Sequence, residues 1–327
     1  MKIAFLTEMA FDGKVPSNHT NMRTEFAWMC AMDADHYCIY NSNSFSKVRN
    51  YDAVYIIFPK GNLFLNSVGG KLTTGTTPTS ALLKMNIVDV LKKQNNAKVF
   101  YIQEGPHWLW NDYEIEDQIN MYNFISMCDG IFAHNESDVN YYRGLFPKAN
   151  IRVMPTLMIE SLIDNIKPIP DNKVIIGGNF ARWYGGFESY VVATEFNLPI
   201  WAQTSHATRE HENLLDNLSH FPRLDWLDWM KELSKFKYAV HLMPTVAAGT
   251  FSLNCAYFGI PTIGNIAVDT QRICHPLLSV DVTDVNGARL LAKRLKEDTN
   301  FYSECSQLAR KNFETHYSIN KFKERVL

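Results

Sequence analysis

The sequence predicts an α/β protein made of two doubly wound domains, each a parallel sheet with helices on both faces. Three observations predict this class. The chain has 327 residues, more than one domain usually holds. Short runs that are apolar throughout, as in strands buried on both faces, alternate with longer runs of helical period. A segment with two prolines, residues 166–172, interrupts that alternation near the middle.

The first half of the chain repeats the order strand, loop, helix. It opens with the apolar run Lys2–Thr7, continues through a loop over 12–18, and then places Met22, Phe26 and Met29 on one helical face. The same alternation continues as far as residue 155. We expect further strands at 36–40, 52–59, 98–103, 130–133 and 151–155, and helices at 80–93, 111–127 and 136–146.

The second half starts a new series at the apolar run 173–178, which ends in two glycines. Further strands are expected at 239–242 and 261–264, and the chain ends in helical segments at 285–298, 301–314 and 319–327. The predicted organisation is therefore an N-terminal domain, a linker, a C-terminal domain and a last helix that could pack back on the first domain. Their ranges are 1–165, 166–172, 173–314 and 315–327.

Composition sets limits on the function. Hydrophobic residues make up 46% and charged residues 20%, with a formal net charge of −2, so there is no overall basic excess to attract nucleic acid. A nucleic-acid partner would need a local basic face. The six cysteines form no C-x-x-C pair, and no stretch approaches the roughly 18 apolar residues of a membrane span. We expect reduced cysteines and a cytoplasmic location.

The most informative segment runs from His241 to Gly264 and predicts a strand, a glycine loop, a short helix and a second strand. Gly249, Thr250 and Ser252 precede the N-terminus of the helix, and Phe251 belongs to the same expected donor-binding set. Free backbone N–H groups and the positive end of the helix dipole would meet a diphosphate there. The alternative is an ordinary strand-to-helix turn with a helix cap.

A second segment, 177–186, follows the first strand of the second half. Glycines such as Gly178 let the backbone approach a ligand closely, and Arg182 offers a planar, permanently charged group to phosphate oxygens. Asn179 lies between them and belongs to the same expected donor-binding set. The alternative is a surface arginine on a flexible turn. Ligands of open α/β sheets gather at the carboxyl ends of strands, which favours the functional interpretation.

Together the two segments resemble the donor-binding half of GT-B glycosyltransferases, in which two Rossmann-like domains face each other across a cleft. The resemblance implies a glycine loop on the diphosphate of a nucleotide sugar and a helix that carries a glutamate to the ribose. This chain departs from the E-x7-E form of that motif, since Val246 and Asn254 stand at the glutamate positions. Asn254 could still bind a ribose hydroxyl, but a retaining mechanism of that type is put in doubt.

A further resemblance, spread over most of the chain, is to the DNA glucosyltransferases of T-even bacteriophages. It is carried by residues 15–17, 98–104 and 177–182. In the inverting beta-type enzyme an acidic base follows the strand that corresponds to 98–103, and Glu104 falls within one position of it. The resemblance implies a UDP-sugar donor, glucose or arabinose as the sugar, and 5-hydroxymethylcytosine in duplex phage DNA as the acceptor, in the host cytoplasm.

From the residues themselves, Glu104 is also the best candidate for a base, because it ends an apolar strand and precedes a turn rich in aromatic residues. Asp12, beside Gly13 in the first loop, is the reserve candidate for catalysis, and Gly13 joins the donor-binding set. The alternative for Glu104 is a capping or salt-bridged glutamate.

The acceptor is expected to meet the turn after Glu104 and a long loop. His107, Trp108 and Trp110 could stack on a sugar or on a flipped base, although such tryptophans are often simply buried. The loop 61–79 contains Lys71 and is long enough to bind an acceptor. No histidine or cysteine spacing predicts a structural metal, but Mg²⁺ or Mn²⁺ could bind weakly with the diphosphate.

Three alternatives stay open at this level. Within the same class, the chain could be a bacterial transferase acting on a surface polysaccharide or glycolipid. Outside it, the chain could be a nucleotide-sugar-binding protein without activity, because the E-x7-E glutamates are missing. A two-domain dehydrogenase is disfavoured, since no G-x-G-x-x-G follows either leading strand. The inverting transferase, with Glu104 as base, is the leading hypothesis.

Overall fold

The structure is a computed structural model that describes residues 1–41, 43–58, 87–95, 97–103, 105–112, 114–178, 180, 183–203 and 210–326. Contacts divide the chain into two compact units. Unit 1 comprises residues 1–17 and 28–154, and unit 2 comprises 18–27 and 155–327. The predicted linker, 166–172, falls inside unit 2, and its last two residues begin a strand of that unit.

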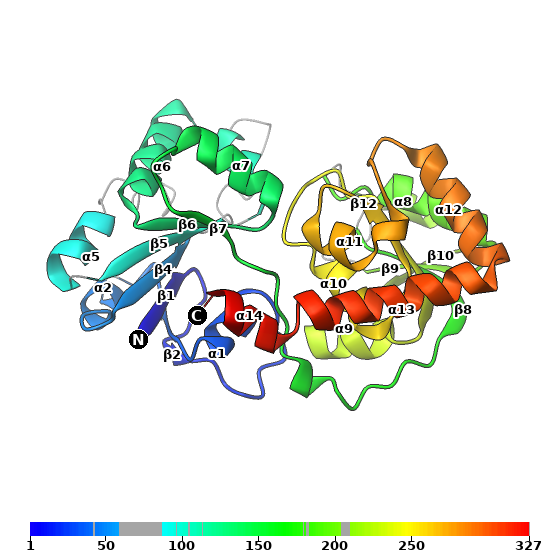
Figure 1. The fold of residues 1–327 in the computed structure, drawn as a ribbon, viewed down its shortest axis with the longest axis horizontal. Coiled ribbons are helices and arrows are strands. Elements are labelled where there is room, and N and C mark those ends of the chain that lie inside the picture. The colour runs from blue at the N-terminus through cyan, green and yellow to red at the C-terminus, as the bar shows by residue number, and fades with distance from the viewer. Residues whose placement is uncertain are drawn as a thin grey trace. The chain divides into compact units, whose positions relative to one another are not determined.

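Unit 1 is built on a seven-stranded sheet in the order β2-β3-β1-β4-β5-β6-β7 (Figure 1). All neighbouring strands are parallel except β2 and β3, which are antiparallel. The chain order reverses at β1, which lies between β3 and β4. The strands are β1 Ile3–Thr7, β2 Gly13–Lys14, β3 Asp35–Cys38, β4 Ala53–Ile57, β5 Lys98–Ile102, β6 Gly130–Ala133 and β7 Ile151–Val153.

Both faces of the unit 1 sheet are covered, which explains why β1, β4 and β6 are buried along their whole length. One face packs against α5, α6 and α7, which Figure 1 shows together on one side of the sheet. The other face carries a ladder of stacked aromatic rings from neighbouring strands: Phe5, Tyr55 and Phe100. The helices are α1 Glu25–Ala31, α2 Ser44–Lys47, α5 Ile87–Asn95, α6 Ile115–Met127 and α7 Glu136–Leu145, with a 3-10 segment at His107–Asp112.

Unit 2 is built on a six-stranded, wholly parallel sheet in the order β10-β9-β8-β11-β12-β13. In the order of the chain this is 3-2-1-4-5-6, the arrangement of dinucleotide-binding sheets. The reversal lies between β8 and β11, which are the first and fourth strands. The strands are β8 Asp171–Ile176, β9 Ile200–Gln203, β10 Leu218–Phe221, β11 Phe236–His241, β12 Thr262–Asn265 and β13 Ser279–Val280.

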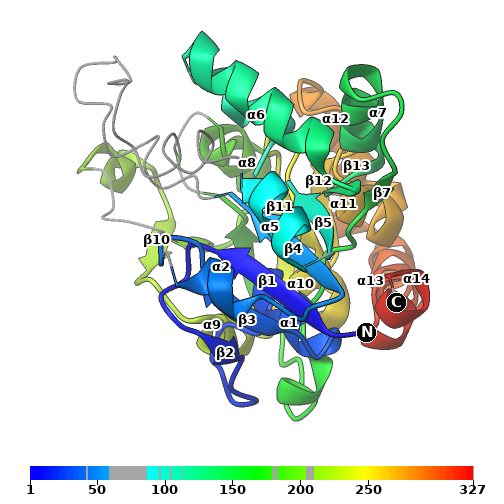
Figure 2. The same cartoon turned by 90° about the vertical axis from the view of Figure 1, so that its left-hand side faces the viewer.

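The helices of unit 2 include α10, which follows β11, and the long C-terminal α13, which packs on α10 and α11 (Figure 2). α14 follows α13, and the Ile319 N–H at its start donates to Glu160 at 2.8 Å. Their bounds are α8 Gly186–Ala193, α9 Trp226–Leu233, α10 Thr250–Phe258, α11 Asp269–Cys274, α12 Val285–Glu297, α13 Thr299–His316 and α14 Ile319–Val326. None of the helices in the described ranges has the length and apolar character needed to cross a bilayer.

The segment 18–27 belongs to unit 2 although it lies early in the chain. Its backbone is tied to elements more than 130 residues away: Thr24 N–H donates to Leu157 O at 2.8 Å, and Leu227 N–H donates to Thr20 O at 3.1 Å. Asn21 Oδ1 accepts from the Trp226 N–H at the start of α9. The helical periodicity around Met22 does not indicate that segment 18–27 belongs to unit 2, because the backbone partners of this segment lie in the other half of the sequence.

Candidate functional site

The carboxyl ends of β8 and β11 adjoin each other in the centre of the unit 2 sheet, at the point where the strand order reverses. Loops leave a sheet in opposite directions at such a point, and open α/β sheets bind their ligands there. The glycine pair predicted from the sequence, Gly177 and Gly178, directly follows β8, and the loop before α10 follows β11. Both predicted donor segments therefore meet at this edge.

Glycine is required at the end of β8 because other groups approach its backbone closely. A Cβ atom on Gly177 would lie 2.5 Å from His241 Cγ and 2.6 Å from Phe251 Cδ1, and one on Gly178 would lie 2.5 Å from Tyr184 O. The His241 and Phe251 rings contact each other edge to face, with centroids 4.9 Å apart. The end of β8, the end of β11 and the first turn of α10 are thus packed together as one surface.

The loop before α10 is held by a second glycine. Gly249 has φ +68°, and a Cβ atom there would lie 2.0 Å from Thr270 Oγ1 and 2.6 Å from Val268 Cγ1. The Thr270 hydroxyl donates to Gly249 O at 2.8 Å, and the Thr156 hydroxyl donates to Ala248 O. No side chain larger than hydrogen fits this position, so the entry to α10 has a fixed geometry.

The first turn of α10 leaves backbone donors without partners. In the described part of the chain the N–H groups of Thr250, Phe251 and Ser252 donate to no acceptor, and the first bond of the helix runs from Leu253 N–H to Gly249 O at 3.2 Å. Unpaired N–H groups at the positive end of a helix dipole form a binding site for an anion. Thr250 at this end of the helix is half-buried, whereas Phe251 and Ser252 are buried.

A second helix start is fixed at the same strand end. Gly185 has φ +63° and caps α8, and a Cβ atom there would lie 1.9 Å from Leu242 O. Ser189, one turn into α8, accepts from the Leu242 N–H at 2.9 Å through its hydroxyl oxygen. The sequence pattern at 177–186 marked this loop as glycine-rich, but the contact with the residue after β11 is set by the tertiary structure.

Two of the predicted donor-binding side chains face into the protein. Ser252 is 3% exposed, and its hydroxyl donates to Gln271 Oε1 at 2.8 Å, which ties α10 to α11. His275 Nε2 lies 3.0 Å from Ser252 O. Asn254 is 1% exposed, and its Oδ1 has no hydrogen-bond partner among the described residues. A direct contact of either side chain with a donor stays a prediction.

His241 is a buried polar group at this strand end that the sequence did not single out for this site. Its Nε2 atom has no hydrogen-bond partner in the described part of the chain. Burial lowers the pKa of His241 to about 4, because the charged form loses its hydration, so the imidazole is neutral at physiological pH. His241 therefore adds a neutral ring to the described part of this strand end, beside the backbone donors of α10.

Four of the predicted site residues lie outside the described residues: Glu104, Lys71, Asn179 and Arg182. Their catalytic, acceptor-binding and donor-binding roles stay predictions. Among the residues that are described, no three histidine, cysteine, aspartate or glutamate side chains gather to hold a metal ion. The weak binding of Mg²⁺ or Mn²⁺ with a diphosphate likewise stays a prediction.

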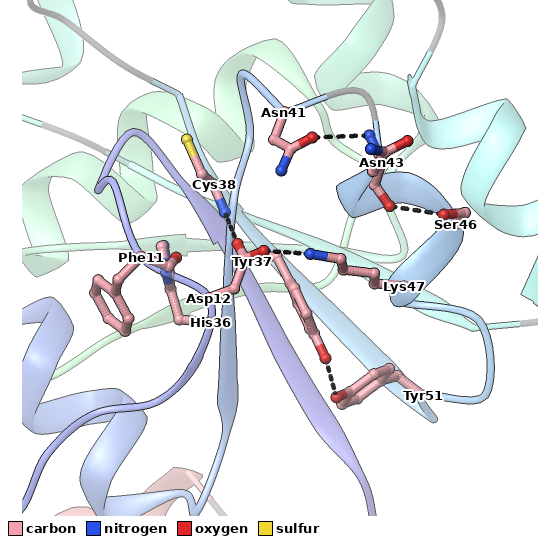
Figure 3. A network of polar contacts seen from close by, with 10 residues as sticks. All are labelled: Phe11, Asp12, His36, Tyr37, Cys38, Asn41, Asn43, Ser46, Lys47 and Tyr51. Atoms are coloured by element: carbon pink, nitrogen blue, oxygen red, sulfur yellow. Dashed lines mark hydrogen bonds and ion pairs between the residues drawn. The ribbon is translucent and has the colours of Figure 1, made fainter.

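In unit 1, both carboxylate oxygens of Asp12, the reserve candidate for catalysis, have partners within the fold. Figure 3 shows its carboxylate between two partners: Oδ1 accepts from the Cys38 N–H at 3.1 Å, and Oδ2 lies 2.5 Å from Lys47 Nζ. The Lys47 ammonium holds the pKa of Asp12 below its usual range. Such a carboxylate is a weak base, and it fastens the loop after β1 to β3 and α2. The adjacent Gly13 has φ +97° and open space around its Cβ position.

The loop after β1 has a second anchor in His36, next to Asp12 in Figure 3. His36 Nδ1 lies 2.7 Å from Phe11 O, and Nε2 lies 2.8 Å from Thr7 Oγ1. Because a carbonyl oxygen only accepts, Nδ1 carries the proton and Nε2 accepts from the hydroxyl. Burial lowers the pKa of His36, which favours this neutral form.

The aromatic residues of the turn after β5 differ in how they are packed. His107 and Trp108 are half-buried, while Trp110 packs against the hydrophobic core of unit 1. His107 Nδ1 lies 2.8 Å from Oδ1 of Asp138, a fully buried carboxylate that the sequence did not single out. The sequence signal for Asp138 is weak, since it is one of two acidic residues in the first turn of α7.

Comparisons with known proteins agree on the fold. No family model and no curated protein matches the sequence. An alpha-glucosyltransferase in complex with UDP and a 13-mer DNA containing an HMU base matches with a TM-score of 0.65 and 11% identity, over 99% of this chain and 98% of that chain. Sucrose-phosphate synthase from Thermosynechococcus elongatus matches with a TM-score of 0.64 and 12% identity, over 99% and 97%.

A third structure, Anabaena HepE in complex with UDP, matches with a TM-score of 0.66 and 9% identity, over 100% of this chain and 98% of that chain. At identities of 11%, 12% and 9%, these structural likenesses show the fold alone. The substrates of this chain have to be inferred from its site. The matches span both units and both parallel sheets. The chain therefore has the GT-B fold, the two-domain architecture of nucleotide-sugar glycosyltransferases.

Proposed function

We propose that the chain is a glycosyltransferase that moves glucose or arabinose from a UDP-sugar to the hydroxyl of 5-hydroxymethylcytosine in duplex DNA. The observation that carries the donor half of this proposal is the first turn of α10. Its first three N–H groups have no acceptor among the described residues, and they lie at the strand-order reversal of a 3-2-1-4-5-6 sheet, where an anionic ligand is expected.

The diphosphate is the part of the donor that this site suits best. As the bond from the anomeric carbon to the diphosphate oxygen breaks, UDP leaves with the electron pair, and negative charge grows on the phosphate. Backbone donors that are already oriented stabilise that charge without reorganisation. Arg182 supplies a second contact in this proposal. A neutral His241 beneath the site adds no positive charge, so the N–H groups and Arg182 account for the attraction.

The acceptor half of the proposal is supported by one solved relative and by the sequence resemblance. The alpha-glucosyltransferase that shares the fold was solved with DNA that contains an HMU base. In the inverting reaction the acceptor oxygen attacks the anomeric carbon, and its proton passes to a base. Glu104 is the base predicted from the sequence.

The test combines binding with transfer. The protein is incubated with UDP-glucose or UDP-arabinose, labelled in the sugar, together with duplex DNA that contains either 5-hydroxymethylcytosine or cytosine. Label on the hydroxymethylated duplex alone supports the proposal. Label on neither duplex, with UDP bound in calorimetry, contradicts the DNA acceptor and leaves a glycan acceptor or a binding protein. If UDP does not bind, the donor site itself is wrong.

A further inference from the structure

Helix α6 of unit 1 carries apolar side chains on two opposite sides. The inner side contributes three buried residues to the hydrophobic core: Met121, Phe124 and Ile125. On the outer side, Ile115, Ile119 and Tyr122 are exposed to 69%, 54% and 44%. A surface helix usually has one apolar stripe, and a helix that is apolar on both sides is typical of one that is buried on both sides. We therefore expect the outer side of α6 to have a partner.

The three outer residues form one continuous surface, which we call the α6 stripe. Ile115, Ile119 and Tyr122 are spaced by four and then three residues, which places their side chains above one another on an α-helix. At one end of the stripe the Tyr122 ring stacks on Phe146, with centroids 4.8 Å apart, and this contact limits the movement of the ring. Contiguous exposed apolar surface marks an interaction site, whereas single exposed apolar residues do not.

Charges of opposite sign mark the two ends of the α6 stripe. The N-terminal end has three acidic residues: Glu114, Glu116 and Asp117. At the C-terminal end, Lys148 is exposed and forms no hydrogen bond or ion pair with the described residues. The loop that carries Lys148 is held at this end because the Ile131 N–H, shortly after α6, donates to Asn150 O at 2.9 Å. Lys92 and Asp129 also lie at this end, but they pair with each other at 3.1 Å.

Two copies of this surface complement each other when their helices pair in opposite directions. A two-fold axis beside Ile119 sets one α6 stripe against the other, and it brings the acidic end of each copy to the Lys148 end of its partner. The dipoles of two antiparallel helices also attract each other. A lipid surface fits less well, because helices that lie on membranes carry lysine and arginine, rather than acidic residues, on their polar face.

We propose that the α6 stripe is the contact between two copies of this chain in a two-fold symmetric dimer. The contact is small, since it consists of one helix from each copy, whereas obligate dimers usually bury about 2,000 Å² or more. The dimer is therefore weak, and its population depends on the protein concentration. This assembly goes beyond the proposed function and requires neither the donor nor the acceptor.

The experiment is sedimentation equilibrium of the full-length protein at concentrations up to about 1 mM, compared with the variant Ile119→Glu. In the dimer the two new carboxylates face each other beside the axis, and an apolar contact is lost. The association constant of Ile119→Glu is therefore expected to fall at least about tenfold. Leu290→Glu is the matched control, because Leu290 is 61% exposed on α12 of unit 2, and it should associate as the wild type does. Thermal melting verifies that each variant is folded.

Charge reversal tests the antiparallel arrangement separately. Glu114→Lys and Lys148→Glu are each expected to lower the association constant about 3- to 30-fold, because the charge pair occurs twice in the dimer. The double variant restores opposite charges at both ends and should associate nearly as tightly as the wild type.

Three results would overturn the proposal: a wild-type protein that stays monomeric at the highest concentration, an Ile119→Glu variant that associates as tightly as Leu290→Glu, or a double variant that is as weak as the single variants. Vesicles of neutral phosphatidylcholine test the other occupant of the stripe. If the wild type is monomeric and binds these vesicles while Ile119→Glu does not, the stripe is a membrane contact and the dimer is wrong.

Discussion

Replacing Thr250 with aspartate separates the anion-binding role of α10 from its stability. Thr250 is the first residue of the helix, is half-buried, and forms no side-chain hydrogen bond with the described residues. A carboxylate there interacts favourably with the helix dipole, so the helix should gain about 0.3–1 kcal/mol. The same carboxylate would face any phosphate that the free N–H groups bind.

The size of the penalty follows from Coulomb's law. For a charge separation of about 6 Å, repulsion per phosphate charge is roughly 0.7 kcal/mol in water and about 3 kcal/mol at an effective dielectric constant of 20. Since about 1.4 kcal/mol is tenfold in affinity, UDP should bind Thr250→Asp roughly 3- to 100-fold more weakly. Asparagine has nearly the shape of aspartate without its charge, so the affinity of Thr250→Asn for UDP should stay close to that of the wild type.

The assay is isothermal titration calorimetry with UDP and with uridine, together with thermal unfolding of each variant. Uridine has no phosphate, so its affinity should be the same in Thr250→Asp and in Thr250→Asn. The UDP difference should shrink as salt is added, because the repulsion is screened. The reasoning is refuted if a folded Thr250→Asp protein binds UDP as tightly as Thr250→Asn does.

Three other outcomes are expected. Gly249→Ala should lower the free energy of unfolding by at least about 2 kcal/mol, since φ +68° and a Cβ atom 2.0 Å from Thr270 Oγ1 both oppose a side chain. Gly144→Ala is the matched control, because Gly144 lies in a helix and has open space around its Cβ position. Its melting temperature should be slightly higher than that of the wild type, since alanine favours a helix more than glycine does. The pKa of about 4 for His241 lies below the ordinary value near 6.5, so the unfolded chain binds a proton that the folded chain excludes. His241 should therefore contribute a fall of about 3 kcal/mol in the free energy of unfolding between pH 6.5 and 4, and denaturant titrations should show a total fall that is smaller by about this amount in His241→Asn.

Much of the fold follows from local patterns in the sequence. The apolar runs at 3–7, 53–57, 98–102 and 130–133 are strands as predicted, because a parallel sheet covered on both faces needs no polar alternation. Strands β9 and β10 gave weaker signals, since β9 is buried only at alternate positions and β10 is half-buried throughout and contains the polar Ser219 and His220. The predicted helix at 111–127 divides into a 3-10 segment ending at 112 and a helix from 115.

Only part of the candidate site could be predicted from the sequence, and the reason is physical. Glycines at 177, 178 and 249 mark backbone positions that tolerate no side chain, and that requirement is visible in the sequence once a strand precedes them. What fills the space beside each glycine is not visible there. His241, Phe251 and Thr270 reach those positions from other strands and helices, so their roles depend on strand order rather than on spacing along the chain.

The sequence by itself determined two doubly wound α/β units and predicted a glycine loop leading into a helix, because hydrophobic period and glycine placement are local properties of the chain. The tertiary structure alone decided that β8 and β11 adjoin at the strand-order reversal, and that a buried Asp138 holds His107. Pairs like these join residues 31 or more positions apart. Which distant residues meet is fixed by the packing of the sheet, and no local period encodes it.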